Sequence, residues 1–140
     1  METNLKFNSA ICTSREQSER LLALGLKKET ADCIWCEVRT LTKGNPIQWY
    51  LLAEHINKHD DKHIPAWSLH RLIEMMPQWI DTTEDSLVLT IDQGKIICYR
   101  RITDEVPTFV FGHTSLYDSI IDAIEKLIKE GHFNKEYLEE

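Results

Sequence analysis

The chain has 140 residues, 42% of them hydrophobic and 28% charged, and its 16 Lys and Arg against 23 Asp and Glu give a formal net charge of −7. This length suits one domain that buries about two-thirds of its unfolded surface. The composition excludes a disordered chain and a collagen-like fibre, and the negative charge disfavours a protein that grips nucleic-acid phosphates. We therefore expect a single domain over residues 1–140, with loosely ordered ends at 1–12 and 134–140, and no nucleic-acid partner.

Targeting signals and cysteine usage predict a cytoplasmic protein. Residues 1–10 lack a basic stretch followed by an apolar run, so they do not resemble a secretory signal. The apolar stretches are far shorter than the roughly 20 residues of a membrane helix, which predicts no membrane partner. The four cysteines stand beside apolar residues, and a domain of this size does not need disulfides. We expect reduced, buried thiols.

The first third of the chain predicts a helix followed by a hairpin. Thr13 and Glu16 have the spacing of a capping box, and the helix that follows should end at Gly25 in a left-handed conformation. Residues 33–39 are rich in strand formers, and residues 47–53 read as the partner strand across a turn.

A polar loop and a second helix should come next. The segment His55–His63 has no apolar pattern and is interpreted as a loop. Pro65 suits the first turn of a helix, where its missing N–H costs nothing. The helix should end at Pro77, and one of its faces repeats apolar residues at helical spacing: Leu69, Leu72, Ile73 and Met76.

The last part predicts three strands and a third helix. The strands are expected at 87–91, 96–101 and 108–112, and Ser115 with Asp118 forms a second capping box. The resulting order is α-β-β-α-β-β-β-α. Because neighbouring strands are joined by short turns, we predict a two-layer α+β fold in which three helices cover one face of an antiparallel sheet of about five strands.

The chain carries a series of motifs in a fixed order: Glu16–Ser18, Leu21–Leu26, Thr30–Asp32, Ile64–Leu69, Leu72–Pro77 and Asp122–Ala123 with Gly131. Together they resemble a family of small uncharacterised proteins encoded by gut-bacterial genomes, especially prophages and other mobile elements. The resemblance extends from about residue 14 to residue 133 and implies an intracellular accessory protein of phage origin, with no activity assigned. In such relatives a Met often stands where this chain has Cys33, which favours a core role for that residue.

One cysteine and histidine pattern is compatible with structural zinc. Cys33 and Cys36, followed by His55 and His59, offer two thiolates and two imidazoles at nearly finger-like spacing. However, the two cysteines lie in an expected strand, where positions i and i+3 point to opposite faces. We therefore expect no metal and no cofactor, and keep a zinc protein using these four residues as an alternative.

No catalytic motif is present, so we expect a protein that is not an enzyme and name no catalytic residue. The binding candidates are Trp67, which could stack on a flat ligand, and Ser68 and Arg71, which could hold its polar groups. The competing interpretation places Trp67 in the core, Ser68 at a helix cap and Arg71 in water. Arg101 belongs to a short basic stretch and could line a pocket for a small ligand.

The number of large rings suggests an interface, because three helices are unlikely to cover both faces of a sheet. The leading hypothesis is a non-enzymatic interaction protein of phage or prophage origin that forms a homodimer through its sheet or an edge strand, or binds another protein. A small-ligand or nucleotide-sequestering protein is the alternative. The rings are Trp35, Trp49, Tyr50, Trp67, Trp79, Phe109 and Phe111.

Overall fold

The computed structural model describes residues 10–38, 48–52, 63–113 and 115–140, and shows an α+β protein with three α-helices and two antiparallel sheets. The helices are α1 (Arg15–Ala23), α2 (Leu69–Met75) and α3 (Leu116–Lys129), with short 3-10 turns at Lys28–Thr30 and Lys135–Tyr137. The three-stranded sheet has the order β2-β1-β3 and is formed by β1 (Cys33–Val38), β2 (Gln48–Leu52) and β3 (His63–Ala66). The four-stranded sheet has the order β4-β5-β6-β7 and is formed by β4 (Trp79–Asp81), β5 (Ser86–Asp92), β6 (Ile96–Arg101) and β7 (Pro107–Gly112).

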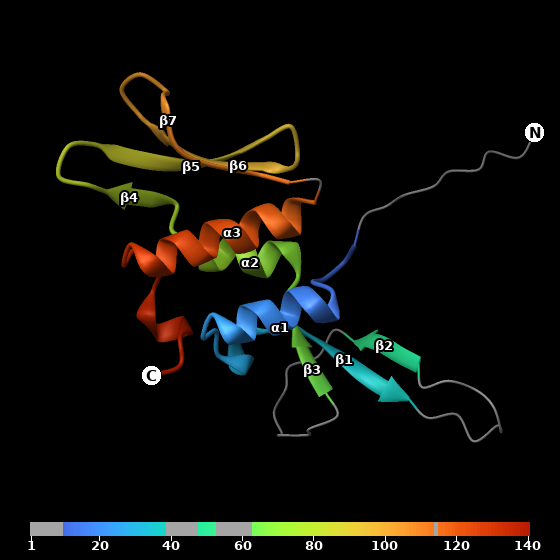
Figure 1. Cartoon of the computed structure of the whole chain (residues 1–140). Coiled ribbons are helices and arrows are strands. Elements are labelled where there is room, and N and C mark those ends of the chain that lie inside the picture. The colour runs from blue at the N-terminus through green and yellow to red at the C-terminus, as the bar shows by residue number, and fades with distance from the viewer. Residues whose placement is uncertain (1–9, 39–47, 53–62, 114) are drawn as a thin grey trace, which may run out of the picture.

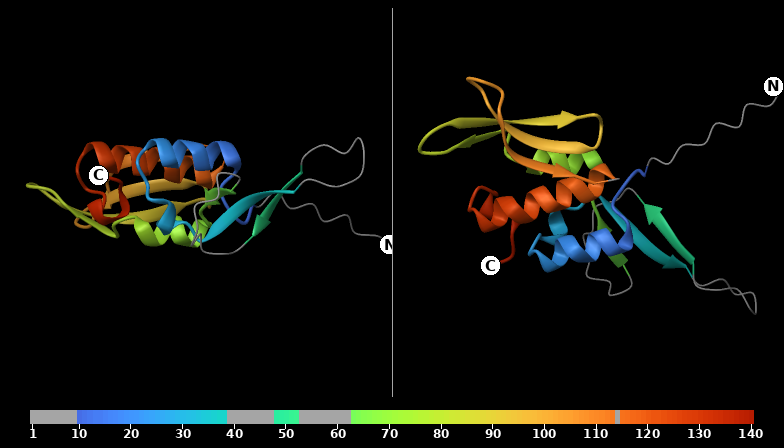
Figure 2. Two further views of the ribbon diagram at one scale, coloured as in Figure 1. Left: turned by 90° about the horizontal axis from the view of Figure 1, so that it is seen from below. Right: turned by 45° about the horizontal axis from the view of Figure 1, so that its top comes forward.

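The helices lie between the two sheets (Figure 1). In both views of Figure 2, α3 runs along one side of the four-stranded sheet and α1 lies beside α3, towards the three-stranded sheet. The helix α3 contacts β6 and β7, while α1 contacts β3. One face of the four-stranded sheet is thus packed against helices, and no described element covers the other.

The class is confirmed as α+β, but the expected single sheet of about five strands is wrong. The residues of β1, β2 and β3 pair only among themselves, in a sheet separate from that of β4 to β7. The expectation that Pro65 begins a helix is also wrong, because Pro65 lies in β3 opposite Ile34. Since β3 is an edge strand, a missing N–H at this position is tolerated.

Helix caps follow the predicted chemistry with different residues. The N-cap of α1 is Ser14, whose side chain accepts from the Gln17 N–H while the Gln17 side chain accepts from the Ser14 N–H. Thr13, the predicted cap, is buried instead. Ser115 is the N-cap of α3 without a side-chain hydrogen bond, so the second capping box is not formed. The helix α1 is followed by Gly25 at φ +101°, the left-handed conformation that was predicted.

The core is built from one face of each element, as the apolar spacing predicts. The helix α3 supplies its largest share, and the inward side of the four-stranded sheet packs against it. The hydroxyl of Tyr99 on β6 donates to the carbonyl of Pro77 at 2.8 Å, so this buried polar atom is satisfied. The core members on α3 are Tyr117, Ile120, Ile121, Ala123, Ile124 and Leu127.

An ionic network joins α1 to α3. The Arg20 guanidinium donates to Asp122 at 2.5 Å and to Glu125 at 3.0 Å. The imidazole of His113, just after β7, contacts the other oxygen of Asp122. Burial raises the pKa of Asp122, but the hydrogen bonds from His113 and Arg20 outweigh it and hold the pKa below its ordinary value. The hydrogen bond from Arg20 also lowers the pKa of Glu125.

Acid is expected to weaken this junction by protonating Asp122. The pKa of Asp122 in the folded protein is lower than its ordinary value of 3.8. The charged carboxylate therefore contributes its full stabilisation above pH 3.8, and this contribution is lost as the pH falls through the pKa of the folded protein. We expect Asp122→Asn to lower the free energy of unfolding at pH 7 and to reduce the loss of stability between pH 7 and pH 3, measured by urea unfolding. Glu84→Gln, a change at an exposed acid between β4 and β5, is the control. An unchanged pH dependence in the Asp122 variant would contradict the prediction.

Candidate functional site

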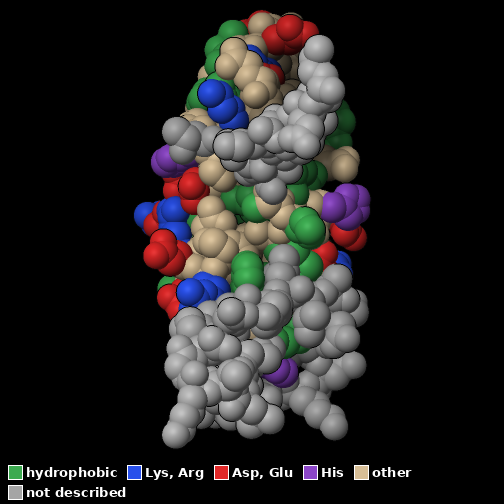
Figure 3. All heavy atoms as spheres, turned by 90° about the vertical axis from the view of Figure 1, so that its right-hand side faces the viewer, with side chains coloured by type: hydrophobic (Ala, Val, Ile, Leu, Met, Phe, Trp, Pro, Cys, Tyr) green, Lys and Arg blue, Asp and Glu red, His purple; other side chains and the backbone are tan. Residues whose placement is uncertain are grey.

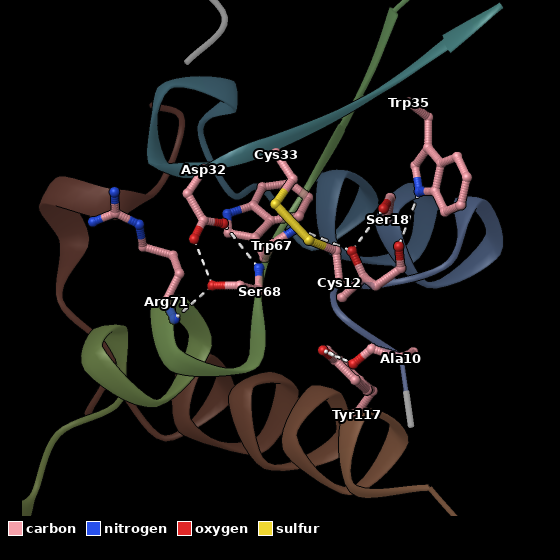
Figure 4. The surroundings of a disulfide bond; sticks show 11 residues. Ala10, Cys12, Ser18, Asp32, Cys33, Trp35, Trp67, Ser68, Arg71 and Tyr117 are labelled. Carbon is pink, nitrogen blue, oxygen red and sulfur yellow. Dashed lines mark hydrogen bonds between the residues drawn. A yellow bond between two sulfur atoms is a disulfide. The ribbon is translucent and has the colours of Figure 1, made fainter. Parts of the chain in front are cut away.

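The predicted binding residues Trp67 and Ser68 are part of the fold's framework. Trp67 is fully buried, and its indole N–H donates to the Thr30 hydroxyl at 2.9 Å. Ser68 caps α2 by accepting from the Arg71 N–H, and both its backbone N–H and its hydroxyl donate to Asp32. Figure 4 shows these contacts clustered where β3 meets α2. The two residues hold this junction, as the competing interpretation expected.

The remaining two candidates are not brought to the same place. The Arg71 guanidinium lies 3.9 Å from Glu74 on the same helix, whereas Arg101 lies at the end of β6, where its guanidinium contacts Asp104 at 2.8 Å. The four predicted residues therefore do not form one binding site. Of the four, Arg101 lines a cavity beside β5 and β6.

The expectation of four reduced thiols is wrong for Cys12 and Cys33, which form a disulfide (Figure 4). The bond connects the segment before α1 to the start of β1. It also removes Cys33 from the zinc ligands considered above, since a metal needs the free thiolate. Cys36 is half-buried, and His55 and His59 lie outside the described residues. In the described part of the chain, no three His, Cys, Asp or Glu side chains gather as metal ligands.

The uncovered side of the four-stranded sheet is the candidate site, and we call it the outer face. The strand register places alternate residues there, opposite the side chains that enter the core. It combines exposed apolar side chains, Trp79 at 57% and Val110 at 56% exposure, with a polar cluster in the middle of the sheet. Its residues are Trp79, Val88, Thr90, Asp92, Cys98, Arg100 and Val110.

The polar cluster is organised by Arg100. Its guanidinium forms an ion pair with Asp92, donates to the Thr90 hydroxyl at 3.2 Å and reaches the carbonyl of Glu105 at 3.3 Å. The hydrogen bond to Asp92 raises the pKa of Arg100. Cys98 is 2% exposed, and burial together with the nearby Asp92 charge raises the pKa of its thiol. Cys98 is therefore poorly suited to act as a nucleophile.

A cavity of about 500 Å³ opens beside this cluster, a volume within the range of small-molecule sites. One wall comes from β5 and the other from the end of β6 and the turn that follows it. The lining combines two arginines and two carboxylates with apolar surface. Among its lining residues are Val88, Asp92, Arg100, Arg101, Ile102 and Glu105.

The strand β7 forms a free edge beside the outer face, because among the described strands it pairs only with β6. The Leu89 N–H donates to the Gln78 carbonyl on the β4 side. In an antiparallel ladder the backbone groups of successive residues point to opposite sides, and residues that exchange hydrogen bonds lie opposite each other. Carried across β6 by the strand register, this alternation points the N–H and C=O groups of Phe109 and Phe111 towards β6 and those of Val110 away from it. Within the described part of the chain, Val110 thus presents an unused backbone donor and acceptor at the edge.

The sequence indicated a short basic stretch at Arg101, but it did not indicate the acids that pair with Arg100 and Arg101 in the fold. Asp92 is eight residues from Arg100 in the sequence and meets it only because β5 and β6 form a hairpin. The alternation of apolar and polar residues over 89–92 is the signal that could have revealed an outer face. Lys and Arg side chains also lie beside Asp and Glu on the face seen in Figure 3, with no continuous basic patch among its described residues.

The chain matches no protein-family model, no curated protein and no solved structure. Among the described helices, none has the length and apolar character needed to cross a membrane.

Proposed function

We propose that the chain is a non-enzymatic interaction protein of mobile-element origin that forms a homodimer by pairing β7 with β7 of a second copy. The mobile-element origin rests on the motif resemblance described above. The observation that carries the homodimer is the free edge of β7, whose central residue Val110 offers its backbone N–H and C=O outward while its side chain is 56% exposed.

The strand β7 is suited to pairing with itself. If two copies meet antiparallel about a two-fold axis at Val110, the two Val110 residues exchange both backbone hydrogen bonds, and the sheet continues over eight strands. The same register sets Phe109 of one copy opposite Phe111 of the other on the helix side. Cross-strand aromatic pairs of this kind contribute roughly 0.2–1 kcal/mol each.

The composition of β7 also favours association. Natural edge strands are commonly protected by charged side chains, above all lysine, yet residues 107–112 include none. Phe109 and Phe111 are only half-buried in one copy, although they pack against the core. Pairing would cover more of both rings, which adds an apolar contribution to the backbone hydrogen bonds.

Sedimentation analysis of the full chain tests the homodimer. We expect wild type at twice the monomer mass and Val110→Pro at the monomer mass, because proline removes the outward N–H without breaking a bond to β6. Val110→Thr is the matched control, since it keeps the N–H and the side-chain shape and should stay dimeric. Far-UV circular dichroism confirms that each variant is folded. A wild type that remains monomeric up to millimolar concentration, or a dimer unaffected by Val110→Pro, overturns the proposal.

A further inference from the structure

The strand β4 gives the four-stranded sheet a second free edge, on the side opposite β7 (Figure 1). The Leu89 N–H donates to the Gln78 carbonyl at 3.0 Å, so the backbone groups of Gln78 point towards β5. Because successive residues of a strand alternate in this respect, the N–H and C=O groups of Trp79 and Asp81 point away from β5. No described strand pairs with them, and they present two donors and two acceptors at the edge.

The same two residues place an aromatic ring and a carboxylate at neighbouring positions on the outer face. The register pairs Trp79 with Val88 and Asp81 with Ser86, which puts both side chains on the uncovered side of the sheet. Trp79 is 57% exposed. The carboxylate of Asp81 accepts a hydrogen bond from the Ser86 hydroxyl at 2.8 Å, which fixes its orientation, and within the described residues it forms no ion pair. It is therefore available to a cation from outside the chain.

An apolar groove of about 390 Å³ lies beside the start of β4. Gln78 supplies the single polar side chain of its described lining, which includes no charged residue. The edge of β4 thus has two chemically different ends, an apolar one at Trp79 and an acidic one at Asp81, where the exposed Glu84 follows in the turn. The groove is lined by Ile73, Gln78, Trp79, Val88, Leu89 and Ile91.

We propose that β4 binds an extended segment of another protein, added antiparallel to its edge, with a basic residue opposite Asp81 and a large apolar residue opposite Trp79. In this direction the basic residue precedes the apolar one by two positions. Each of them exchanges both backbone hydrogen bonds with the residue opposite. Their side chains lie on the outer face, the cation beside the carboxylate and the apolar group beside the indole and the groove.

Charge and backbone together select this partner. The unused N–H and C=O groups at the edge require an extended segment, since a helix satisfies its own backbone groups. The carboxylates of Asp81 and Glu84, on a chain with a formal net charge of −7, attract a basic segment and repel an acidic one. A charged residue on an edge strand also limits indiscriminate pairing. The strand β7 lies at the opposite edge of the sheet, so this inference is independent of the proposed homodimer.

Fluorescence anisotropy of a labelled, end-blocked peptide of sequence TTRTFTT, titrated with the full chain, tests the strand pairing. We expect saturable binding. Methylation of the phenylalanine backbone nitrogen removes the N–H that meets the Trp79 carbonyl and should weaken binding about tenfold or more. Methylation of the central threonine nitrogen, which points away from β4, is the matched control and should have little effect. No binding up to millimolar protein, or equal affinity of the two methylated peptides, overturns the proposal.

A charge exchange tests the assignment of Asp81. Asp81→Arg should weaken binding of TTRTFTT about tenfold and should bind TTETFTT, in which glutamate replaces arginine, better than wild type does. Glu136→Gln, a change at an exposed acid far along the chain, should behave as wild type. Circular dichroism checks that each variant is folded. Val110→Pro should bind the peptide like wild type, whether or not β7 forms a dimer. A peptide preference unchanged in Asp81→Arg, or a peptide that dissociates a wild-type dimer and so competes with a second copy for β4, would overturn the proposal.

Discussion

Replacing Trp67 by alanine is expected to lower the free energy of unfolding by about 3–5 kcal/mol, the usual range for a fully buried tryptophan. The side chain has no exposed surface, and its removal leaves a cavity in the core. It also removes the indole donor to the Thr30 hydroxyl, which keeps its own hydrogen bond to the Lys27 carbonyl. A domain of this kind has a total stability of about 5–15 kcal/mol. Urea unfolding followed by circular dichroism measures the loss.

Two further variants separate burial from hydrogen bonding. Trp67→Phe keeps most of the apolar volume and loses the indole donor to Thr30, so it should cost less than the alanine variant. Trp79→Ala makes the same truncation at a side chain that is 57% exposed and should cost less still. If the alanine variants of Trp67 and Trp79 were equally stable, Trp67 could not be the anchor of this junction, and a ligand-binding role for it would regain support.

Local periodicity predicted the elements that bury one continuous face. The strand β6 was predicted at its exact bounds, and the third helix in its place in the chain, because each has enough residues to display its period. The strand β4 has three residues, Trp79–Asp81, too few to show an alternation. The strand β3 was missed because Pro65 suggests a helix start, and only its place at a sheet edge makes proline acceptable.

The number of sheets could not be predicted from local patterns. A strand's sequence shows which side is apolar, but its partner is decided by packing across the molecule. The carbonyl of Thr13 accepts from the indole of Trp35 at 3.0 Å, while the Thr13 N–H donates to the carbonyl of Trp67 at 2.9 Å. These contacts fasten the N-terminal segment to β1 and to the residue that follows β3, and they join residues too far apart in the sequence for a local pattern to reveal.

The candidate site was predictable only in part, for similar reasons. Arg101 was proposed as a residue that could line a small-ligand pocket, and that binding role stays a prediction. Among the other residues that line the cavity, Asp92 comes from β5 and Glu105 from the turn after β6. Trp67 and Ser68 have the residue types of a binding motif, yet they fill structural roles. Trp67 donates a hydrogen bond to Thr30 and Ser68 donates one to Asp32, and both acceptors lie in the segment between α1 and β1. Residue type identifies candidates, and the topology decides which of them face solvent.

Reduction of the Cys12–Cys33 disulfide is expected to lower the free energy of unfolding by about 2–4 kcal/mol. The two cysteines are 21 residues apart. A crosslink that closes such a loop lowers the conformational entropy of the unfolded chain, which raises the free energy of unfolding by roughly 3 kcal/mol. The bond also lies in a buried cluster with Ala66, so it supports the position of Thr13 against β3. Urea unfolding with and without reductant measures the difference.

Matched variants identify the bond that is responsible. The double variant Cys12→Ser/Cys33→Ser should unfold like the reduced wild type and should no longer respond to reductant, whereas Cys36→Ser should keep the full response. Mass spectrometry after alkylation of the unreduced, denatured chain should find two modified cysteines, Cys36 and Cys98.

Because the disulfide fixes the segment that leads into α1, its loss should weaken the attachment of the three-stranded sheet before that of β4 to β7. Hydrogen exchange should therefore rise first in β1 and β3. Four alkylated cysteines, or a stability that is independent of reductant, would return the chain to the reduced state that its composition suggests.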